Sequence, residues 1–392
     1  MMNFSSTVRS WAARIFALLS LVWVAACDVP VSSTGGNTGA RIDPSQPVQV
    51  ALLVPGGSAK ESDNILAQNL ENAARLAMAD LSGVTVDLRV YNTAGSPAQA
   101  AAVATQAVND GAKVILGPLY AEAANAAGVA VAGRNVNVLA FSNNASIAGN
   151  NVFILGATFQ NTANRLVSYA ARQGRRNVAV VYGEDLQGSV GRDATANAAR
   201  NAGVALSTVQ SYGMSQQAII SAAGPIANAI KSSGADAVVL TGGINADLPI
   251  IATGLSEQGV DSSSFVGLTR WDAAGQAVSL PGLQNGIFAV PDTNMMNLFE
   301  SRYTQAYGSA PHPLAGLAFD GIAAIGALAA GGDANALTRN SLTKTQGFEG
   351  TQGVFRLLPN GTNERALAIA QIQNNQVVIL EPAPRSFAGF GF

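Results

Sequence analysis

The sequence of 392 residues contains one cysteine and one histidine, so it has little of what metal centres and nucleophilic enzymes need. A zinc site built from Cys and His ligands is therefore not expected. A Ser–His or Cys–His enzyme would have to use His312 as its base. A single cysteine also rules out a disulfide framework within the chain. These shortages favour a binding protein over an enzyme.

Charge is scarce as well. Only 12% of the residues are Asp, Glu, Lys or Arg, and 22 basic residues face 24 acidic ones. No broad basic surface can follow from this balance, so nucleic acid is not an expected partner. Hydrophobic residues make up 48% of the chain, which is enough for large buried cores and excludes a wholly disordered chain.

The N-terminus explains the single cysteine. Arg9 and Arg14 precede an apolar run over 15–26, which is the pattern of a signal peptide. The run closes with Val-Ala-Ala followed by Cys27, which resembles the bacterial lipobox. The resemblance implies a lipoprotein signal peptide at 1–26 and a Cys27 that carries lipid, palmitate included. A plain secretory signal followed by a spare thiol is the alternative, and the choice between outer and inner membrane stays open.

The rest of the chain alternates between strand-like and helix-like segments. After a flexible Ser/Gly/Thr/Pro linker expected over 27–46, apolar runs typical of buried strands are separated by amphipathic helical stretches. The expected strands are 48–54, 84–91, 113–116, 136–141, 177–182, 204–211, 235–240, 265–268 and 286–290. This alternation predicts an α/β fold of doubly wound parallel sheets flanked by helices. Roughly ten strands exceed one compact sheet, so two lobes are expected.

The C-terminal part has a different pattern. Long helices are expected over 298–307 and 314–330, followed by antiparallel strands at 353–357, 366–371 and 377–380. Asn374-Asn375 supplies a turn between the last two strands. The end of the chain, 382–392, is expected to be an extended tail.

The order of several segments resembles the type I periplasmic binding fold, in particular the leucine/isoleucine/valine-binding protein family. The segments are Asn109 to Pro118, Val138 to Ser142, Val178 to Tyr182, Ala237 to Gly243 and Phe355 to Gly361. The resemblance implies two lobes that close on a ligand, joined by three hinge crossovers near 154–158, 287–292 and 345–350. Lobe 1 would comprise 47–156 and 291–346, and lobe 2 would comprise 157–290 and 347–381.

Ligands of open α/β sheets bind beyond the carboxyl ends of the strands. The cleft candidates in lobe 1 are Ser58, Asn92, Tyr120, Ser142 and Asn143. Those in lobe 2 are Tyr182, Glu184, Asp185, Gly243, Asn245, Arg270, Trp271 and Asp272.

Two departures from amino-acid receptors of the family stand out. The loop at Tyr120 lacks the hydroxyl residues that such receptors use for the substrate carboxylate, and Glu122 would repel one. Arg270 also stands where an acid for the substrate ammonium is expected, with Asp272 nearby. Arg270 beside Trp271 could instead meet a carboxylate-rich ligand such as a peptidoglycan fragment, or could form a surface pair between the lobes.

Two other motifs are weaker evidence for a function. Ser341-Leu342-Thr343-Lys344 matches the Ser-x-x-Lys pattern of penicillin-interacting enzymes, but the companion motifs do not follow it. Glu184-Asp185 is one adjacent acidic pair without further ligands. No cofactor, metal or catalytic residue is therefore expected.

Two functions remain open. The lipobox and the altered loop favour a lipoprotein similar to the LpoA-type activators, which would bind a class A penicillin-binding protein and regulate peptidoglycan synthesis. The alternative is a substrate-binding lipoprotein that delivers an amino acid or similar small solute to an ABC permease. Either protein would reside in the periplasm, anchored by lipid to the outer or inner membrane.

Overall fold

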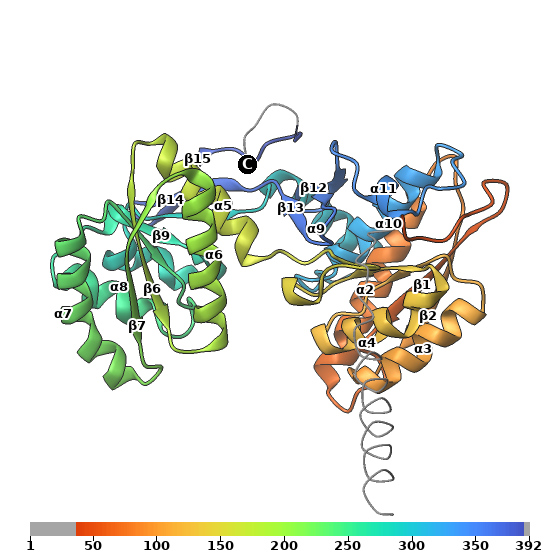
Figure 1. Cartoon of the computed structure of the whole chain (residues 1–392), viewed down its shortest axis with the longest axis horizontal. Helices are drawn as coiled ribbons and strands as arrows, with labels where there is room; N and C mark the ends of the chain where they lie inside the picture. The colour runs from red at the N-terminus through yellow and green to blue at the C-terminus, as the bar shows by residue number, and fades with distance from the viewer. Residues whose placement is uncertain (1–36, 388–392) are drawn as a thin grey trace, which may run out of the picture. The chain divides into compact units, whose positions relative to one another are not determined.

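The computed structural model describes residues 37–387, and it confirms the predicted α/β fold with two sheets flanked by helices (Figure 1). The expectations for the signal peptide, Cys27 and the last residues of the tail lie outside the described part. Within that part, no helix is both long and apolar enough to cross a membrane.

The first sheet is parallel and has the order β2-β1-β3-β4-β5. Its strands are β1 (Val48–Val54), β2 (Val86–Asn92), β3 (Val114–Leu116), β4 (Asn137–Ala140) and β5 (Val152–Ile154). The helices α2 (Glu61–Ala79), α9 (Thr293–Tyr307) and α10 (Gly316–Ala329) share one hydrophobic core with this sheet. The helices α3 (Pro97–Asn109) and α4 (Ala121–Val131) share a second core on the other face. The short helix α11 (Arg339–Leu342) follows α10.

Small side chains let the second pair of helices approach the first sheet closely. Ala100 and Ala104 of α3 and Ala124 of α4 are completely buried. Gly128 of α4 comes so near β5 that an added Cβ would lie 2.3 Å from the Val152 side chain. The alanine-rich sequence of these helices thus serves tight helix–sheet packing.

The second sheet has the order β15-β14-β10-β9-β8-β6-β7. Its parallel strands are β6 (Asn177–Gly183), β7 (Ala205–Tyr212), β8 (Ala237–Leu240), β9 (Phe265–Gly267) and β10 (Ile287–Val290). The strands β14 (Ala368–Gln373) and β15 (Gln376–Glu381) continue the sheet in antiparallel fashion. The helices α5 (Phe159–Arg172) and α6 (Leu186–Ala202) pack on one face, and α7 (Gln216–Ser233) and α8 (Leu248–Glu257) pack on the other.

A small third sheet lies on the other side of the lobe boundary from where we expected it. It consists of β11 (Phe348–Gly350), β12 (Gly353–Leu357) and β13 (Asn363–Arg365). Phe355 and Leu357 are buried in the core that the first sheet forms with α2 and α10. Residues 348–357, which we expected in lobe 2, therefore pack with lobe 1, and lobe 2 resumes at β14.

The second half of the segment that we expected to be a flexible linker packs against the first lobe instead. Ile42 is buried in the first-lobe core, and its N–H donates to the carbonyl of Ala334 at 2.9 Å. The side chain of Asn137 donates to the carbonyl oxygens of Thr38 and Leu337 at 3.0 and 2.9 Å. Residues 38–42 are thus fixed to the first lobe, because one apolar side chain and several backbone groups find partners there.

The crossovers between the lobes are connected by buried hydrogen bonds. Asn363 donates through its amide to the carbonyl oxygens of Ile154 and Gly156 at 2.7 and 2.9 Å. Arg365 donates to the Leu155 carbonyl, and its own backbone exchanges two bonds with the Asn161 side chain. The first crossover, just before α5, and the third, between β13 and β14, are therefore held side by side.

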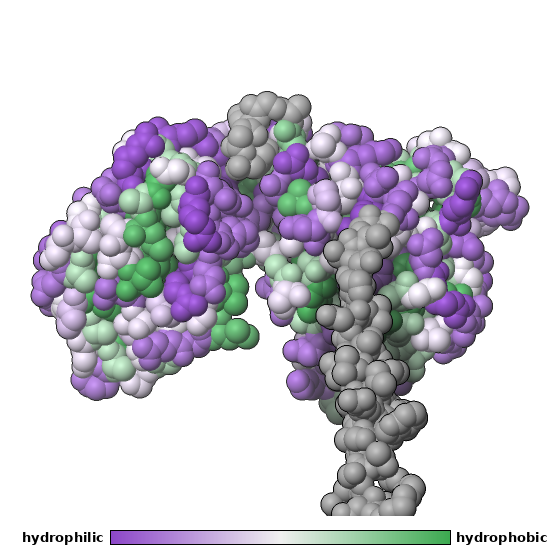
Figure 2. All heavy atoms as spheres, viewed as in Figure 1, coloured by the Kyte–Doolittle hydropathy of each residue, from purple (hydrophilic) through white to green (hydrophobic). Residues whose placement is uncertain are grey.

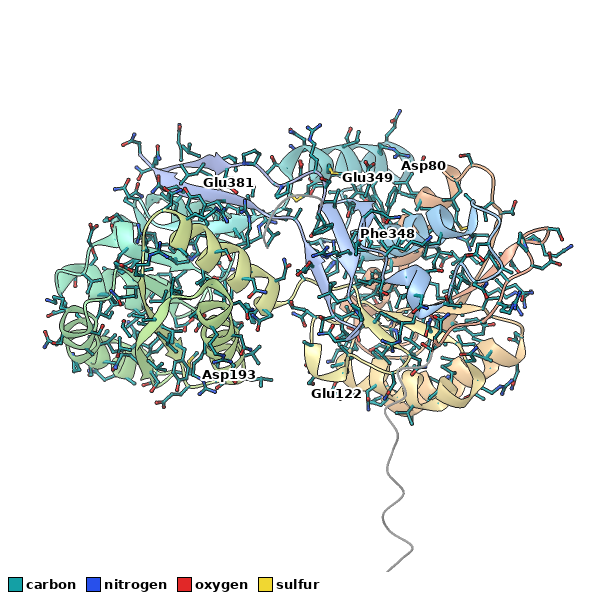
Figure 3. All side chains as sticks on the ribbon, turned by 45° about the horizontal axis from the view of Figure 1, so that its top comes forward. Asp80, Glu122, Asp193, Phe348, Glu349 and Glu381 are labelled. Atoms are coloured by element: carbon teal, nitrogen blue, oxygen red, sulfur yellow. The ribbon has the colours of Figure 1, made fainter. Side chains whose placement is uncertain are left out.

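An ion cluster connects α5 to the edge strand β15. Arg165 and Arg172 both lie near the carboxylate of Glu381, at 2.8 and 3.1 Å. Glu381 is labelled in Figure 3. Partial burial opposes ionisation of Glu381, but the two guanidinium groups outweigh it, so the pKa of Glu381 lies below its ordinary value.

We expect Glu381→Gln to lower the free energy of unfolding by about 1 kcal/mol at pH 7, because the pairs are partly exposed to solvent. A carboxyl with a lowered pKa stabilises the fold above its unfolded pKa and loses that effect as the pH falls through the folded value. The difference between the two proteins should therefore shrink below about pH 4.3. Urea unfolding at several pH values measures it, with the exposed Glu257→Gln as control, and a difference that grows on acidification would contradict the assignment.

Candidate functional site

The predicted first-lobe candidates lie at the carboxyl ends of the first sheet. Ser58 follows β1, Asn92 ends β2, Tyr120 precedes α4, and Ser142 and Asn143 follow β4. Parallel strands bring their carboxyl ends to one edge, which explains how segments far apart in sequence meet here. Ser142 is almost completely buried, whereas Asn92, Tyr120 and Asn143 are exposed.

Tyr120 is engaged by a residue that the sequence analysis missed. Its hydroxyl donates to the carboxylate of Asp63 at 2.6 Å. This bond and partial burial raise the pKa of Tyr120 to about 12. Asp63 lies in the first turn of α2 and is only 6% exposed. The next helix, α4, adds Glu122 in its own first turn, at the surface (Figure 3).

In the second lobe, Tyr182, Glu184 and Asp185 follow one another at the end of β6. Asp185 accepts the Gly188 N–H at 2.7 Å and so caps α6, which is the ordinary role of Asp at this position. Glu184 accepts the hydroxyl of Ser211 at 2.8 Å. Tyr182 packs against the guanidinium of Arg192, whose carbon lies 5.2 Å from the ring centre. Gly243 and Asn245 lie in the loop after β8, as predicted.

Arg270, Trp271 and Asp272 all contact other residues of the protein. Arg270 makes two hydrogen bonds to Asp272, at 3.0 and 2.6 Å, so its charge is already compensated. Trp271 is completely buried and stacks on Phe288 with ring centres 5.5 Å apart. Arg270 thus pairs with an acid of its own loop, and Trp271 belongs to the core.

Asp247 is the residue at this end of lobe 2 that sequence reasoning missed. It is 5% exposed, accepts the Tyr212 hydroxyl at 2.5 Å and accepts the Gly243 N–H at 2.7 Å. Burial and the bond to Asp247 raise the pKa of Tyr212 well above its ordinary value. The available signal was an aspartate placed directly before the Leu-Pro that opens α8.

A cavity of about 70 Å³ lies beside Asp247. Asp185, Gln187, Met214 and Thr241 also line it, together with the loop at Gly243. In the first two turns of α6, Leu186 is 80% exposed and Val190 is 45% exposed, and Figure 2 shows hydrophobic patches in green on the surface of this lobe. This end of lobe 2 thus combines a small acidic cavity with exposed aliphatic side chains at the start of α6.

Other residues that the sequence analysis weighed lie in ordinary structural surroundings. Ser341 of the Ser-x-x-Lys pattern is buried and donates to the Asn335 carbonyl at 2.9 Å. Burial lowers the pKa of His312, whose Nδ1 accepts the Leu314 N–H. Between residues 37 and 387, no three His, Cys, Asp or Glu side chains gather as a metal site would need.

A further cavity, of about 440 Å³, lies away from the strand ends. It is bounded by α2, α9, α10 and β11, with Phe299 and Phe319 in its wall and an Arg302–Asp80 ion pair at 2.5 Å. None of the predicted ligand residues lines this cavity.

Comparison with known proteins agrees with this geometry. Residues 47–376 match the family described as periplasmic binding protein. A comparison with curated protein sequences finds no match.

Several solved structures share the fold at low sequence identity. A putative branched-chain amino acid ABC transporter protein from Rhodospirillum rubrum is 17% identical with a TM-score of 0.71, over 86% of this chain and 100% of its own. An ABC transporter substrate-binding protein from Desulfitobacterium hafniense in complex with Leu is 16% identical, with a TM-score of 0.61 over 86% and 100%. An ABC transporter solute-binding protein from Rhodopseudomonas palustris in complex with 3,4-dihydroxybenzoic acid is 16% identical, with a TM-score of 0.54 over 86% and 98%.

Proposed function

Because this chain belongs to the periplasmic binding protein family, whose members bind solutes and are not enzymes, we propose that it is the solute-binding component of an ABC importer. The observation that carries the proposal is the family match over 47–376, which includes both lobes and all three crossovers. The solute would be a small organic molecule, and the partner would be an ABC permease.

The placement of polar groups supports a ligand at the strand ends. In each lobe a buried acid and a tyrosine hydroxyl lie where the parallel strands end, Asp63 with Tyr120 and Asp247 with Tyr212. Binding proteins of two lobes hold a ligand by closing about their hinges, so each lobe contributes half of the contacts. The lobe-1 candidates Ser58, Ser142 and Asn143 and the lobe-2 candidates Gly243 and Asn245 would complete the polar lining.

The lipid anchor remains part of the proposal. A Cys27 with several acyl chains would hold the protein durably at a membrane. Such anchoring would keep the binding lobes close to a permease in the same membrane.

Activation of a class A penicillin-binding protein, which we expected from the lipobox and the altered loop at Tyr120, receives no support from these comparisons. The named structures are transport components and solute-binding proteins. The altered loop has a second explanation, since the Tyr120 hydroxyl is engaged by Asp63.

We expect a thermal-shift screen of the purified protein to reveal at least one small ligand. The screen would contain the twenty L-amino acids, aliphatic diamines, benzoate and 3,4-dihydroxybenzoate. A compound at a hundred times its dissociation constant stabilises the folded state by about 2.7 kcal/mol, which raises Tm by several degrees in a domain of this size. Co-purification with a permease would support the transport role. A silent screen together with capture of a class A penicillin-binding protein would instead favour the activator.

A further inference from the structure

Each lobe presents a buried carboxylate at its ligand end without a cation to balance it. Asp63 and Asp247 are 6% and 5% exposed. The hydrogen bonds that reach them come from neutral donors, namely Tyr120, Tyr212 and the Gly243 N–H. Across residues 37–387, neither carboxylate forms an ion pair with a lysine, arginine or histidine. Buried charges in proteins are usually paired, so two such acids at a binding edge suit a positively charged ligand.

The second-lobe cavity provides room for a cationic group. Asp247 and Asp185 line about 70 Å³ of space, and the residues around it include no lysine or arginine. Thr241 lines the same cavity, and its hydroxyl is buried without a hydrogen-bond partner in the described part of the chain. An unsatisfied buried hydroxyl is costly, whereas an ammonium group could donate to Thr241 as well as to the carboxylate.

The two arginines near these edges, Arg270 and Arg192, each pair with an acid. Arg270 is held by Asp272, and Arg192 is held by Asp193 at 2.8 Å. Lys60 stays exposed at the start of α2. Among the described residues, the two arginines near these edges therefore each hold an acid of their own, which competes with a ligand carboxylate for the guanidinium.

The first lobe also disfavours a carboxylate. The loop before α4 offers the Tyr120 hydroxyl, which is bound to Asp63, and then Ala121 and Glu122. Two acids near this edge would repel a ligand anion at close range. Exposed apolar side chains also occur on the elements that carry or flank the two acids, with Ile65 on α2 and Leu186 and Met214 in lobe 2.

We propose that the solute is an aliphatic diamine or a related amine without a carboxylate, with one ammonium received at Asp247 and the other at Asp63. The inference rests on the proposed solute-binding function and adds the charge of the solute. It separates this chain from relatives solved with leucine or with an aromatic acid.

The test compares putrescine with L-ornithine, which is the same diamine carrying a carboxylate, by isothermal titration calorimetry on the purified protein. L-Leucine and benzoate complete the set. We expect putrescine or its longer homologue cadaverine to bind at least tenfold more tightly than the matched amino acid, L-ornithine or L-lysine. Asp247→Asn and Asp63→Asn should each weaken diamine binding at least tenfold. The exposed Asp333→Asn, which removes the same charge elsewhere in lobe 1, should leave it unchanged.

Each other outcome has a definite meaning. Tighter binding of L-ornithine, L-leucine or benzoate overturns the charge assignment while the solute-binding function stands. Diamine binding that survives both Asp→Asn changes in folded protein, checked by circular dichroism, also overturns it. If no small molecule binds and no permease co-purifies, the proposed function fails together with this inference.

Discussion

Replacing Arg365 with methionine is expected to destabilise the protein by about 3–5 kcal/mol. Arg365 is buried, and its guanidinium lies 2.9 Å from the carboxylate of Asp320, which is itself completely buried. Methionine fills similar space but leaves the Asp320 charge without a cation. Uncompensated charge in a protein interior is among the few causes of so large an effect.

The same substitution also removes contacts at a crossover. Arg365 donates through Nε and Nη2 to the Leu155 carbonyl, at 3.0 and 2.6 Å, and its guanidinium lies over the ring of Phe355. Asp320 in turn accepts the Thr351 N–H at 2.6 Å, which fixes the end of β11. One ion pair thus connects α10, the third sheet and the first crossover, so the loss is expected to appear in global unfolding.

Urea unfolding at pH 7 measures the loss, and Arg89→Met is the matched control. Arg89 pairs with Asp87 at 2.9 Å, but both side chains are well exposed. Exposed pairs contribute at most about 1 kcal/mol. Adding Asp320→Leu to Arg365→Met should recover part of the stability, because the second change removes the unpaired charge. A single change at Arg365 that costs no more than the change at Arg89 would contradict the role of the buried pair.

The arrangement of the strands could be predicted because each long strand carries its own signal. The run Val48–Val54 is apolar throughout and lies in the centre of a parallel sheet, where both faces are buried. The Asn374-Asn375 turn predicted the last hairpin, and both residues have the positive φ that such turns require. The three-residue strands β5, β11 and β13 were not predicted, because strands this short show no period; β3 and β9, equally short, were predicted from their place in the alternation of strands and helices.

The site was predicted only in part, for a different reason. Strand ends mark an edge, but they do not reveal which side chains at that edge are already paired. Arg270 follows β9 as predicted, yet its neighbour Asp272 binds it. Asp63 and Asp247 lie at or near the starts of α2 and α8, where acids commonly stabilise helix ends. Only the three-dimensional structure brings each of them to a tyrosine from another segment.

Trp271 is another residue whose surroundings the sequence did not reveal. Its replacement gives the second large expected loss of stability. Trp271 follows the end of a strand and stands next to an arginine, and this position in the sequence suggested a ligand contact. Its indole instead fills the space left by two glycines: an added Cβ at Gly267 or Gly286 would lie 2.3 or 2.7 Å from the ring. The glycines thus create room for one large side chain against Phe288.

We expect Trp271→Ala to lower the free energy of unfolding by about 3–5 kcal/mol, as truncation of a large buried aromatic residue does. Trp271→Phe keeps a ring against Phe288 and should cost less. Chemical unfolding measures both changes.

Fluorescence gives an independent check, because the other two tryptophans, Trp11 and Trp23, lie in the predicted signal peptide. In protein that lacks this segment, emission should be that of a buried indole and should shift to longer wavelength only on unfolding. Ligand should not quench it directly, since the ring is closed off from solvent. If Trp271→Ala caused only a small loss of stability and weakened ligand binding, Trp271 would instead be a ligand contact. The expected combination, a large loss of stability and emission unaffected by ligand, would show that Trp271 acts in the core that α7 and α8 form with the second sheet, and not in ligand recognition.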